Sequence, residues 1–227
     1  MADLAFPAPP PVTVPVEGGG DFPVRRIFCV GRNYGAHVRE MGGDEKEHPP
    51  IFFTKPADAV VVGGADIAYP SVTQDLHHEI ELVVALKAGG RDIAEDAALD
   101  CVFGYATGVD LTRRDLQGLA KKGGAPWDAA KAFDNSAPLG LLRRAEGAAP
   151  PSGEIRLTVD GDARQHAPLS DMIWSVAEII AAASKLWELK AGDLIFTGTP
   201  EGVGAIARGQ RVEGRVADLA PVAFTVV

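Results

Sequence analysis

The chain has 227 residues, 46% of them hydrophobic and 23% charged, a composition typical of a globular protein and unlike a disordered chain, a coiled coil or a collagen-like repeat. The 31 acidic against 22 basic residues give a net charge of −9, so the overall field repels phosphate backbones and anionic membrane surfaces. We expect no nucleic-acid partner and no membrane partner. No apolar run approaches the roughly 18 residues that cross a bilayer, and the start of the chain does not match a signal peptide, which predicts a cytoplasmic protein.

The N-terminal segment, residues 1–23, is rich in proline, with six of the 17 prolines of the chain. Proline fixes the backbone in an extended form, so this segment is predicted to be extended, with a short strand at residues 12–16, and to lie over the main body. From Val24 the pattern of apolar residues becomes regular. Residues 24–227 are therefore predicted to form a single domain.

Short apolar segments separated by proline and glycine follow along that domain. Strands are predicted at residues 24–31, 77–86 and 101–112, with a helix at 33–41 between the first two. A hairpin is predicted at residues 154–165, where Asp160 and Gly161 suit a tight turn, and a longer helix at 175–188. Because strands outnumber helices and do not alternate with them regularly, the fold is predicted to be α+β and β-rich.

Two acids in the strand at residues 77–86, HHEIELVVAL, require an explanation. Glu79 and Glu81 are two residues apart, so in a strand their side chains share one face. Two like charges on a buried face cost several kcal/mol per ion unless a cation compensates them. A bound metal ion is one solution; the alternative is that this strand begins at the rim, with both carboxylates in water.

A third acid, Asp110, ends the uncharged stretch at residues 101–109. Three carboxylates from two buried strands make an oxygen donor set that suits Mg²⁺ or Mn²⁺, with Ca²⁺ also possible. The neighbouring residues do not offer the thiolates or paired imidazoles that zinc favours. The two cysteines, Cys29 and Cys101, are predicted to be buried, reduced thiols.

Further polar residues have both a catalytic and a structural interpretation. His37 and Glu40 lie three residues apart on the predicted helix and form either a general-base pair or a solvated ion pair. Lys131 is either an active-site cation or a surface lysine, and Arg32 either binds a carboxylate or caps a turn. The glycine-rich GTPEGVG stretch lacks dinucleotide spacing and is predicted to be a loop that approaches a ligand closely.

Six motifs occur in the same order as in a known family, and the chain resembles the fumarylacetoacetate hydrolase superfamily in its short, acylpyruvate hydrolase branch. These motifs are CVGRNYGAHVREMG, PPIFFTKPADAVV, HHEIELVVAL, GVDLTRRDLQ, KAFDNSAPLG and GDLIFTGTPEGVG. The resemblance spans residues 24–204. It implies a mixed β-roll or β-sandwich with flanking helices, a single catalytic domain at residues 24–227, and a homodimer.

The resemblance also implies roles for individual residues. Glu79, Glu81 and Asp110 would hold the Mg²⁺ or Mn²⁺. His37 and Glu40 would activate a water molecule, with Lys131 as the third catalytic residue. The substrate contacts would be Arg32, Gln117 and Thr199.

The implied activity is metal-dependent hydrolysis of the C3–C4 bond of a 2,4-dioxo acid to pyruvate and a carboxylic acid. The substrate most indicated is fumarylpyruvate, in gentisate breakdown. The alternatives within the superfamily are oxaloacetate decarboxylation and isomerisation of 2-hydroxyhepta-2,4-diene-1,7-dioate; outside it stands a non-catalytic protein that binds small acids. We expect specificity to lie around His48 and residues 121–127, and Arg113 or Arg114 to contact a diacid if the loop turns inward.

Overall fold

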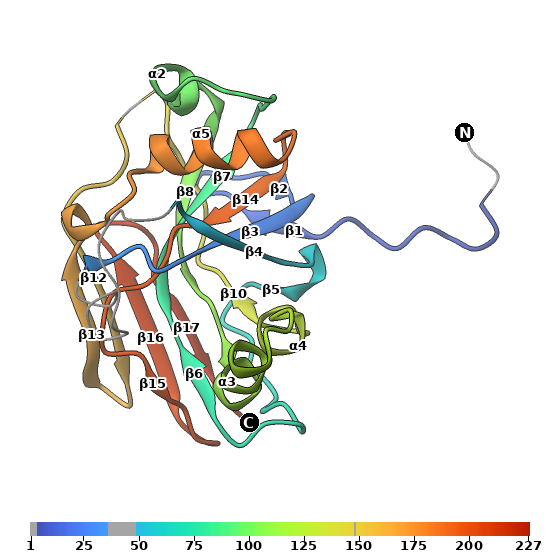
Figure 1. The fold of residues 1–227 in the computed structure, drawn as a ribbon. Helices are drawn as coiled ribbons and strands as arrows, with labels where there is room; N and C mark the ends of the chain where they lie inside the picture. The colour runs from blue at the N-terminus through green and yellow to red at the C-terminus, as the bar shows by residue number, and fades with distance from the viewer. Residues whose placement is uncertain (1–3, 36–48, 148) are drawn as a thin grey trace.

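The computed structural model describes residues 4–35, 49–147 and 149–227 (Figure 1). Over these ranges strands far outnumber helices, and parallel and antiparallel pairs occur in one sheet. The predicted α+β, β-rich class is confirmed.

The largest sheet has six strands and carries most of the residues of interest. In spatial order its strands are β11 (Arg143–Arg144), β8 (Val102–Val109), β7 (Ile80–Leu86), β14 (Asp193–Phe196), β3 (Arg26–Gly31) and β4 (Ile51–Lys55). β3 and β14 are parallel, whereas the other neighbours are antiparallel. Because β3 and β14 run the same way, the segments that follow them leave the same edge of the sheet.

Both faces of this sheet are buried, which explains the near-continuous apolar runs of its central strands. On β3, Phe28 contributes to one apolar cluster and Ile27 to another. The first cluster includes α5 (Val176–Leu186), which crosses the sheet in Figure 1. The second includes apolar residues of the N-terminal segment.

A second sheet is antiparallel and packs its apolar residues into the first cluster. Its strands are β13 (Asp162–Pro168), β12 (Glu154–Val159), β16 (Arg211–Val216) and β17 (Val222–Thr225). The predicted hairpin is the pair β12–β13. Its turn residues Asp160 and Gly161 have φ of 52° and 87°, as a tight two-residue turn requires.

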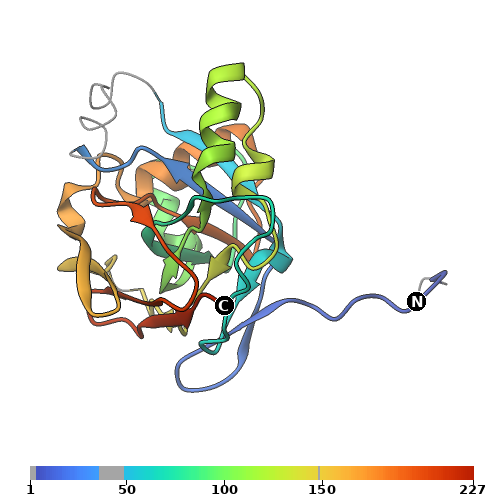
Figure 2. The same ribbon diagram turned by 90° about the horizontal axis from the view of Figure 1, so that it is seen from below.

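The remaining elements are short. One small sheet joins β15 (Gly204–Ala205), β6 (Leu76–His78) and β9 (Thr112–Arg113), and another joins β10 (Ala137–Pro138) and β5 (Val60–Val61). The other helices are η1 (Ala57–Ala59), α2 (Glu95–Ala98), η2 (Leu99–Cys101), α3 (Arg114–Gly123), α4 (Asp128–Lys131) and η3 (Leu169–Asp171). Helices α3 and α4 lie side by side in both views (Figures 1 and 2).

Helix α5 begins where the sequence predicts and ends earlier. Ser175 caps its N-terminus, and the Ser175 and Glu178 side chains each bond the other residue's backbone amide, which is a capping box. The helix ends at Leu186 rather than at residue 188. Trp187 leaves the helix, and its ring packs against Phe28, with centroids 4.9 Å apart.

The N-terminal segment contributes a hairpin and an extended arm. The hairpin consists of β1 (Thr13–Pro15), which lies in the predicted strand, and β2 (Asp21–Pro23). Its residues Val14 and Phe22 are buried in the second cluster. Residues 4–11 extend away from the body in both views (Figures 1 and 2). The division at residue 23 stays a prediction. Within the described ranges, no helix is long and apolar enough to cross a membrane.

Asp193, at the start of β14, ties the parallel pair together, and its loss is expected to destabilise the sheet. Its buried carboxylate accepts hydrogen bonds from Arg25 (2.9 Å), from Arg26 (3.1 Å) and from the Lys190 amide (2.9 Å). Because hydrogen bonds to a charged group are the stronger kind, Asp193→Asn should cost about 2 kcal/mol and lower Tm by about 4–8 °C in thermal unfolding.

The control makes the same change in an exposed ion pair. Asp218 lies 2.8 Å from Arg143 and its side chain is 83% exposed, so Asp218→Asn should leave Tm nearly unchanged. Equal shifts for the two variants would contradict the role given to Asp193.

Candidate metal centre and pocket

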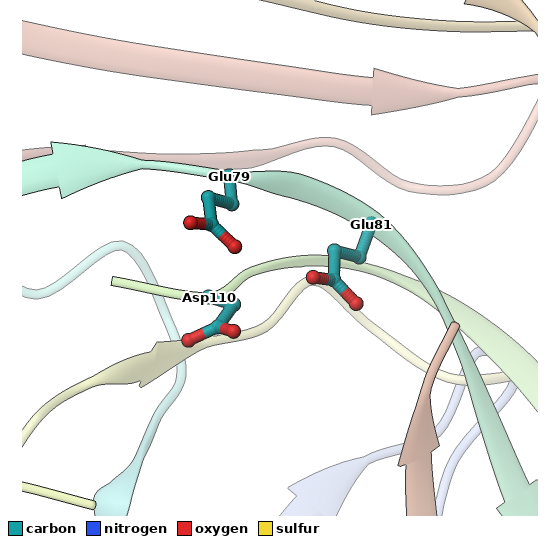
Figure 3. A group of neighbouring side chains, drawn as sticks. All are labelled: Glu79, Glu81 and Asp110. Atoms are coloured by element: carbon teal, nitrogen blue, oxygen red, sulfur yellow. The ribbon is translucent and has the colours of Figure 1, made fainter. Parts of the chain in front are cut away.

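Three carboxylates converge inside the molecule. Glu79, Glu81 and Asp110 are 7%, 1% and 0% exposed, and each offers an oxygen within 4.8 Å of those of the other two. Figure 3 shows the three side chains directed toward one region from neighbouring segments. The alternative that the glutamates stand at a solvated rim is therefore wrong.

The register of two strands sets this arrangement. The predicted strand at residues 77–86 is broken at Glu79, which lies between β6 and β7, but the Glu79 and Glu81 side chains still lie on the same side of the chain, as predicted (Figure 3). Ile80 is paired with Val109, and one step further the Asp110 amide donates to the Glu79 carbonyl oxygen (2.8 Å). Strand pairing thus places the third acid beside the first.

Gly198 holds Glu81 in place. Its amide donates to Glu81 Oε2 (2.6 Å) from the loop after β14. Its φ is +97°, and a Cβ there would lie 2.7 Å from the Asn33 Cβ, so a side chain is excluded on both counts. The glycine-rich stretch does make a close approach, here to a candidate metal ligand.

Lys131 is a buried cation that joins two of the carboxylates. It is 2% exposed, and its Nζ donates to Glu79 Oε2 (2.8 Å), Asp110 Oδ2 (2.6 Å) and Thr112 Oγ1 (2.6 Å). The interpretation as a surface lysine is therefore wrong. Burial alone would lower the pKa of Lys131, but the charges of Asp110 and Glu79 raise it, so the side chain stays protonated.

Lys55, a second buried lysine, was not among the predicted site residues. It is 2% exposed, its Nζ lies 2.8 Å from Asp110 Oδ1, and it also donates to the carbonyl oxygens of Leu111 and Lys131. The signal was available in the sequence: Lys55 ends the apolar strand IFFTK, which is the pattern that marked Asp110.

The two glutamates have opposite protonation preferences. Burial would raise the pKa of Glu79, but the charges of Lys131 and Arg114 outweigh it and hold that pKa well below its usual range. For Glu81, burial and the charges of Asp110 and Glu79 raise the pKa well above its usual range. A proton on Glu81 is one way to relieve the repulsion, and a bound cation is the other.

The donor set fits a divalent metal ion. Carboxylate oxygens are the ligands that Mg²⁺ and Mn²⁺ prefer. Asp110 Oδ1 has Lys55 within ion-pair distance but receives no well-directed hydrogen bond, although it is fully buried. Glu79, Glu81 and Asp110 are thus the residues that would hold the ion.

A pocket opens beside Glu79 and Lys131. The predicted substrate contacts Arg32, Gln117 and Thr199 all line it. Its other lining residues are Val30, Gly31, Phe53, Arg114, Lys121 and Trp127. The structure thus brings the predicted contacts together with Lys131 around one pocket.

Arg32 reaches this pocket from the turn after β3. Its φ is 62°, in the left-handed region that non-glycine residues rarely adopt outside turns. The buried Asn33 side chain fixes the turn, because it donates to the Thr197 carbonyl oxygen (2.7 Å) and accepts from the Trp174 amide (2.6 Å). This contact links the turn after β3 to the loop after β14.

Arg114 points inward, as a contact to a diacid would require. Its guanidinium donates to Glu79 Oε1, to Gln117 Oε1 (2.6 Å) and to His77 Nδ1 (3.3 Å). Because Arg114 donates to the side-chain oxygen Oε1 of Gln117, the side-chain NH₂ group of Gln117 is available to donate to a ligand. His77 and the buried His78 are supporting residues, and desolvation lowers the pKa of each, which favours neutral rings.

Gln165, on β13, orients Thr199 and was missed by the sequence analysis. Its Oε1 accepts from the Ile80 amide (3.0 Å) and pairs with His78 Nδ1 (2.9 Å), and its Nε2 donates to Thr199 Oγ1 (2.8 Å). Because Thr199 Oγ1 is thereby an acceptor, its hydroxyl proton is available to an oxygen atom in the pocket. The side-chain amide of Gln165 thus bonds both the backbone next to Glu79 and the hydroxyl of Thr199.

The predicted pair His37 and Glu40, and also His48, fall in residues 36–48, outside the described ranges. Their roles stay predictions. The thiols of Cys29 and Cys101 are buried and free, as expected.

Comparison with known proteins identifies the family. Residues 26–227 match the family model described as fumarylacetoacetate hydrolase C-terminal, and the chain belongs to this family. The resemblance seen in the motifs is confirmed, and with it the expected fold.

Three relatives show the range of activities in the family. The crystal structure of fumarylpyruvate hydrolase from Pseudomonas aeruginosa in complex with Mn²⁺ and pyruvate is 48% identical, covers 99% of each chain and has a TM-score of 0.96. Oxaloacetate tautomerase YcgM of Escherichia coli is 42% identical over 85% of this chain and 88% of its own length. A fumarylpyruvate hydrolase of Ralstonia sp. is 40% identical over 81% of this chain and 95% of its own length. These relatives are enzymes, with hydrolase and tautomerase activities at similar identity.

The raised pKa of Glu81 predicts that metal binding depends on pH. Below that pKa the carboxyl carries a proton that the ion must displace, so affinity should rise with pH, by up to about tenfold per unit for one proton, and level off above it. Mn²⁺ titration by calorimetry from pH 5.5 to 8, in buffers of different ionisation enthalpy, measures both the affinity and the proton released.

Glu81→Gln is the control, because it removes both a ligand and the titrating group. That variant should bind Mn²⁺ weakly and release no proton on binding. Constant affinity of the wild-type protein across this pH range would show that Glu81 is already ionised without the ion.

Proposed function

We propose that the protein is a metal-dependent hydrolase that cleaves the C3–C4 bond of a 2,4-dioxo acid to pyruvate and a carboxylic acid. The favoured acylpyruvate is fumarylpyruvate, which would give fumarate. The observation that carries the proposal is the buried group of Glu79, Glu81 and Asp110, in which Lys131 bridges Glu79 and Asp110 and Glu79 lines a cationic pocket. Its metal would be Mg²⁺ or Mn²⁺, with Ca²⁺ third, and its setting a cytoplasmic homodimer.

The similarity to fumarylpyruvate hydrolase extends over nearly the whole chain. The Pseudomonas aeruginosa structure covers 99% of this chain at 48% identity, whereas the Escherichia coli tautomerase and the Ralstonia hydrolase match it about equally, at 42% and 40% identity. The Pseudomonas aeruginosa hydrolase holds Mn²⁺ and pyruvate, which are the cofactor and the product proposed for this chain. This support favours hydrolysis over tautomerisation.

The pocket residues would orient the substrate. A divalent ion held by the three carboxylates would supply a Lewis acid for the oxygens of the 2-oxo acid. Arg32 would pair with the substrate carboxylate. The Thr199 hydroxyl and the Gln117 NH₂ group would donate to its oxygens, because Gln165 and Arg114 already occupy their acceptor atoms. These donors would fix the orientation of the bound 2-oxo acid and thereby the direction in which its acyl group points.

Lys131 would stabilise negative charge rather than move a proton. Its pKa is raised, so its ammonium group is held in the charged form beside the reacting end of the pocket. A fixed positive charge in a buried site is most effective where charge develops during the reaction. In C–C hydrolysis that charge develops on the pyruvate part as the C3–C4 bond breaks.

His37, oriented by Glu40, would be the general base, as the family motif implies. It would take a proton from the water molecule that adds to the 4-carbonyl carbon, a role suited to an imidazole near neutral pH. The C3–C4 bond then breaks, the acyl part leaves as a carboxylic acid, and carbon 3 takes up a proton to give pyruvate.

The second candidate function is tautomerisation of oxaloacetate. The relative at 42% identity, an oxaloacetate tautomerase, favours it, and the cations that line the pocket suit the two carboxylates of oxaloacetate. Three further functions are compatible with the same site: oxaloacetate decarboxylation, isomerisation of 2-hydroxyhepta-2,4-diene-1,7-dioate, and binding of small acids without turnover.

A single assay series separates these functions. Loss of enol absorbance from fumarylpyruvate, acetylpyruvate and oxaloacetate is followed together with pyruvate release, each with Mg²⁺, with Mn²⁺ and with EDTA. We expect metal-dependent release of one pyruvate per fumarylpyruvate consumed, and His37→Ala should lower the rate by at least about 100-fold without weakening Mn²⁺ binding. Turnover of oxaloacetate alone would overturn the hydrolase, and saturable binding without turnover would point to a binding protein.

Gln165 and Thr199 are expected to act as one unit in binding pyruvate. Gln165→Met and Thr199→Val should each weaken pyruvate binding to the Mn²⁺-loaded protein by about tenfold, and the double variant should be little weaker than the poorer single one. Calorimetry measures the three affinities. Gln74→Met makes the same change at an exposed position and should bind normally; a 100-fold loss in the double variant would show independent roles.

A further inference from the structure

Helix α3 presents a row of three polar side chains to the pocket. Arg114, Gln117 and Lys121 are spaced i, i+3 and i+7, so they share one face of the helix, and all three line the pocket. Arg114 contacts Glu79 at the inner end. Lys121 lies seven residues further on, about 10 Å along the helix axis. The row therefore leads from the metal ligands toward the outer end of the pocket.

Lys121, at that outer end, has more cationic than anionic neighbours. Its Nζ lies 5.0 Å from the centroid of the Trp127 ring, and no carboxylate in the described part of the chain forms an ion pair with it. Desolvation and the charges of Arg114 and Arg32 lower the pKa of Lys121, and the charge of Glu79 offsets this only in part. Positive charges brought together in this way favour an anion between them.

The balance of charges in the whole site also favours binding of an anion. Within the described ranges, the site holds five cationic and three anionic side chains. The cations are Arg32, Lys55, Arg114, Lys121 and Lys131, and the anions are Glu79, Glu81 and Asp110. A divalent ion would add to this positive excess, and one substrate carboxylate would offset only part of it. In a chain of net charge −9, this local excess favours a substrate with more than one negative charge.

We propose that Lys121 binds the second carboxylate of a dicarboxylate substrate at the outer end of the pocket and thereby selects diacids over 2-oxo acids with a neutral end. The inference rests on the proposed function for the reaction, but the selection applies equally to fumarylpyruvate and to oxaloacetate, because both carry a second carboxylate. The Lys121 Nζ lies over the Trp127 ring, and Arg32, from the turn after β3, adds positive charge to the same pocket.

The test compares Lys121→Gln with Lys122→Gln. Both variants remove one positive charge from neighbouring, exposed positions of α3, but only Lys121 lines the pocket. The readout is the ratio of kcat/KM for fumarylpyruvate to that for acetylpyruvate, which differ in the second carboxylate. Lys121→Gln should lower this ratio by about tenfold or more, mainly through KM for fumarylpyruvate, because a charge-assisted contact is lost. Lys122→Gln should leave it within about twofold.

Lys121→Arg keeps the charge and should retain most of the preference. An unchanged ratio in Lys121→Gln, or equal losses for both substrates, would overturn the assignment. A purely structural effect of the substitution would produce that second result.

A binding experiment separates failure of this inference from failure of the proposed function. If the wild-type protein hydrolyses neither substrate, the hydrolase proposal fails, and the Mn²⁺-loaded protein is titrated with 2-oxoglutarate and with 2-oxobutyrate. Tighter binding of 2-oxoglutarate that is lost in Lys121→Gln and kept in Lys122→Gln would support the role of Lys121. Equal binding of both acids, or a preference that survives in Lys121→Gln, would refute it.

Discussion

Three carboxyl groups buried with oxygens within 4.8 Å of one another are the constraint on which the rest of this structure depends. Carboxylates taken out of water cost several kcal/mol each unless cations and hydrogen bonds compensate them. Here the compensation comes from distant parts of the chain: Lys55 at the end of β4, Lys131 at the end of α4, and Arg114 at the start of α3. The acids lie in or next to the central strands β7 and β8, and the cations come from β4 and from helices α3 and α4, so the balance of charge depends on the folded arrangement of these segments.

The parallel pair β3–β14 has a comparable role for the backbone. The turn after β3 carries Arg32 and the loop after β14 carries Gly198 and Thr199, and the parallel direction brings these segments to one edge. Asn33 then bonds the two segments to each other, and the Gly198 amide reaches Glu81. The substrate-facing residues are thus held by the same sheet that holds the metal ligands.

Much of the site could be read from local sequence because its key residues break a local pattern. Glu81 and Asp110 stand out as acids beside apolar strands, and Asp160–Gly161 and Ser175 follow well-known rules for turns and helix caps. Lys55 shows the same pattern, a charged residue at the end of an apolar strand, although it was not among the predicted site residues. The break at Glu79 and the role of Gln165 had no local signal, because they arise from a hydrogen bond between Ile80 and a residue 85 positions away, on another sheet. Tertiary contacts of that kind become visible only with the fold.

The outer turns of α3 differ from the rest of the pocket wall in one respect. Residues 118–124 are mostly exposed and none of them contributes to the carboxylate group, whereas Arg114 and Gln117, one turn earlier, are tied to it. Under the role proposed for Lys121, sequence change in this short stretch would alter which acids bind without changing the carboxylate group. Such a fold would allow related proteins to keep one catalytic centre and differ in their substrates. The relatives of this chain, which include a hydrolase and a tautomerase, are consistent with that.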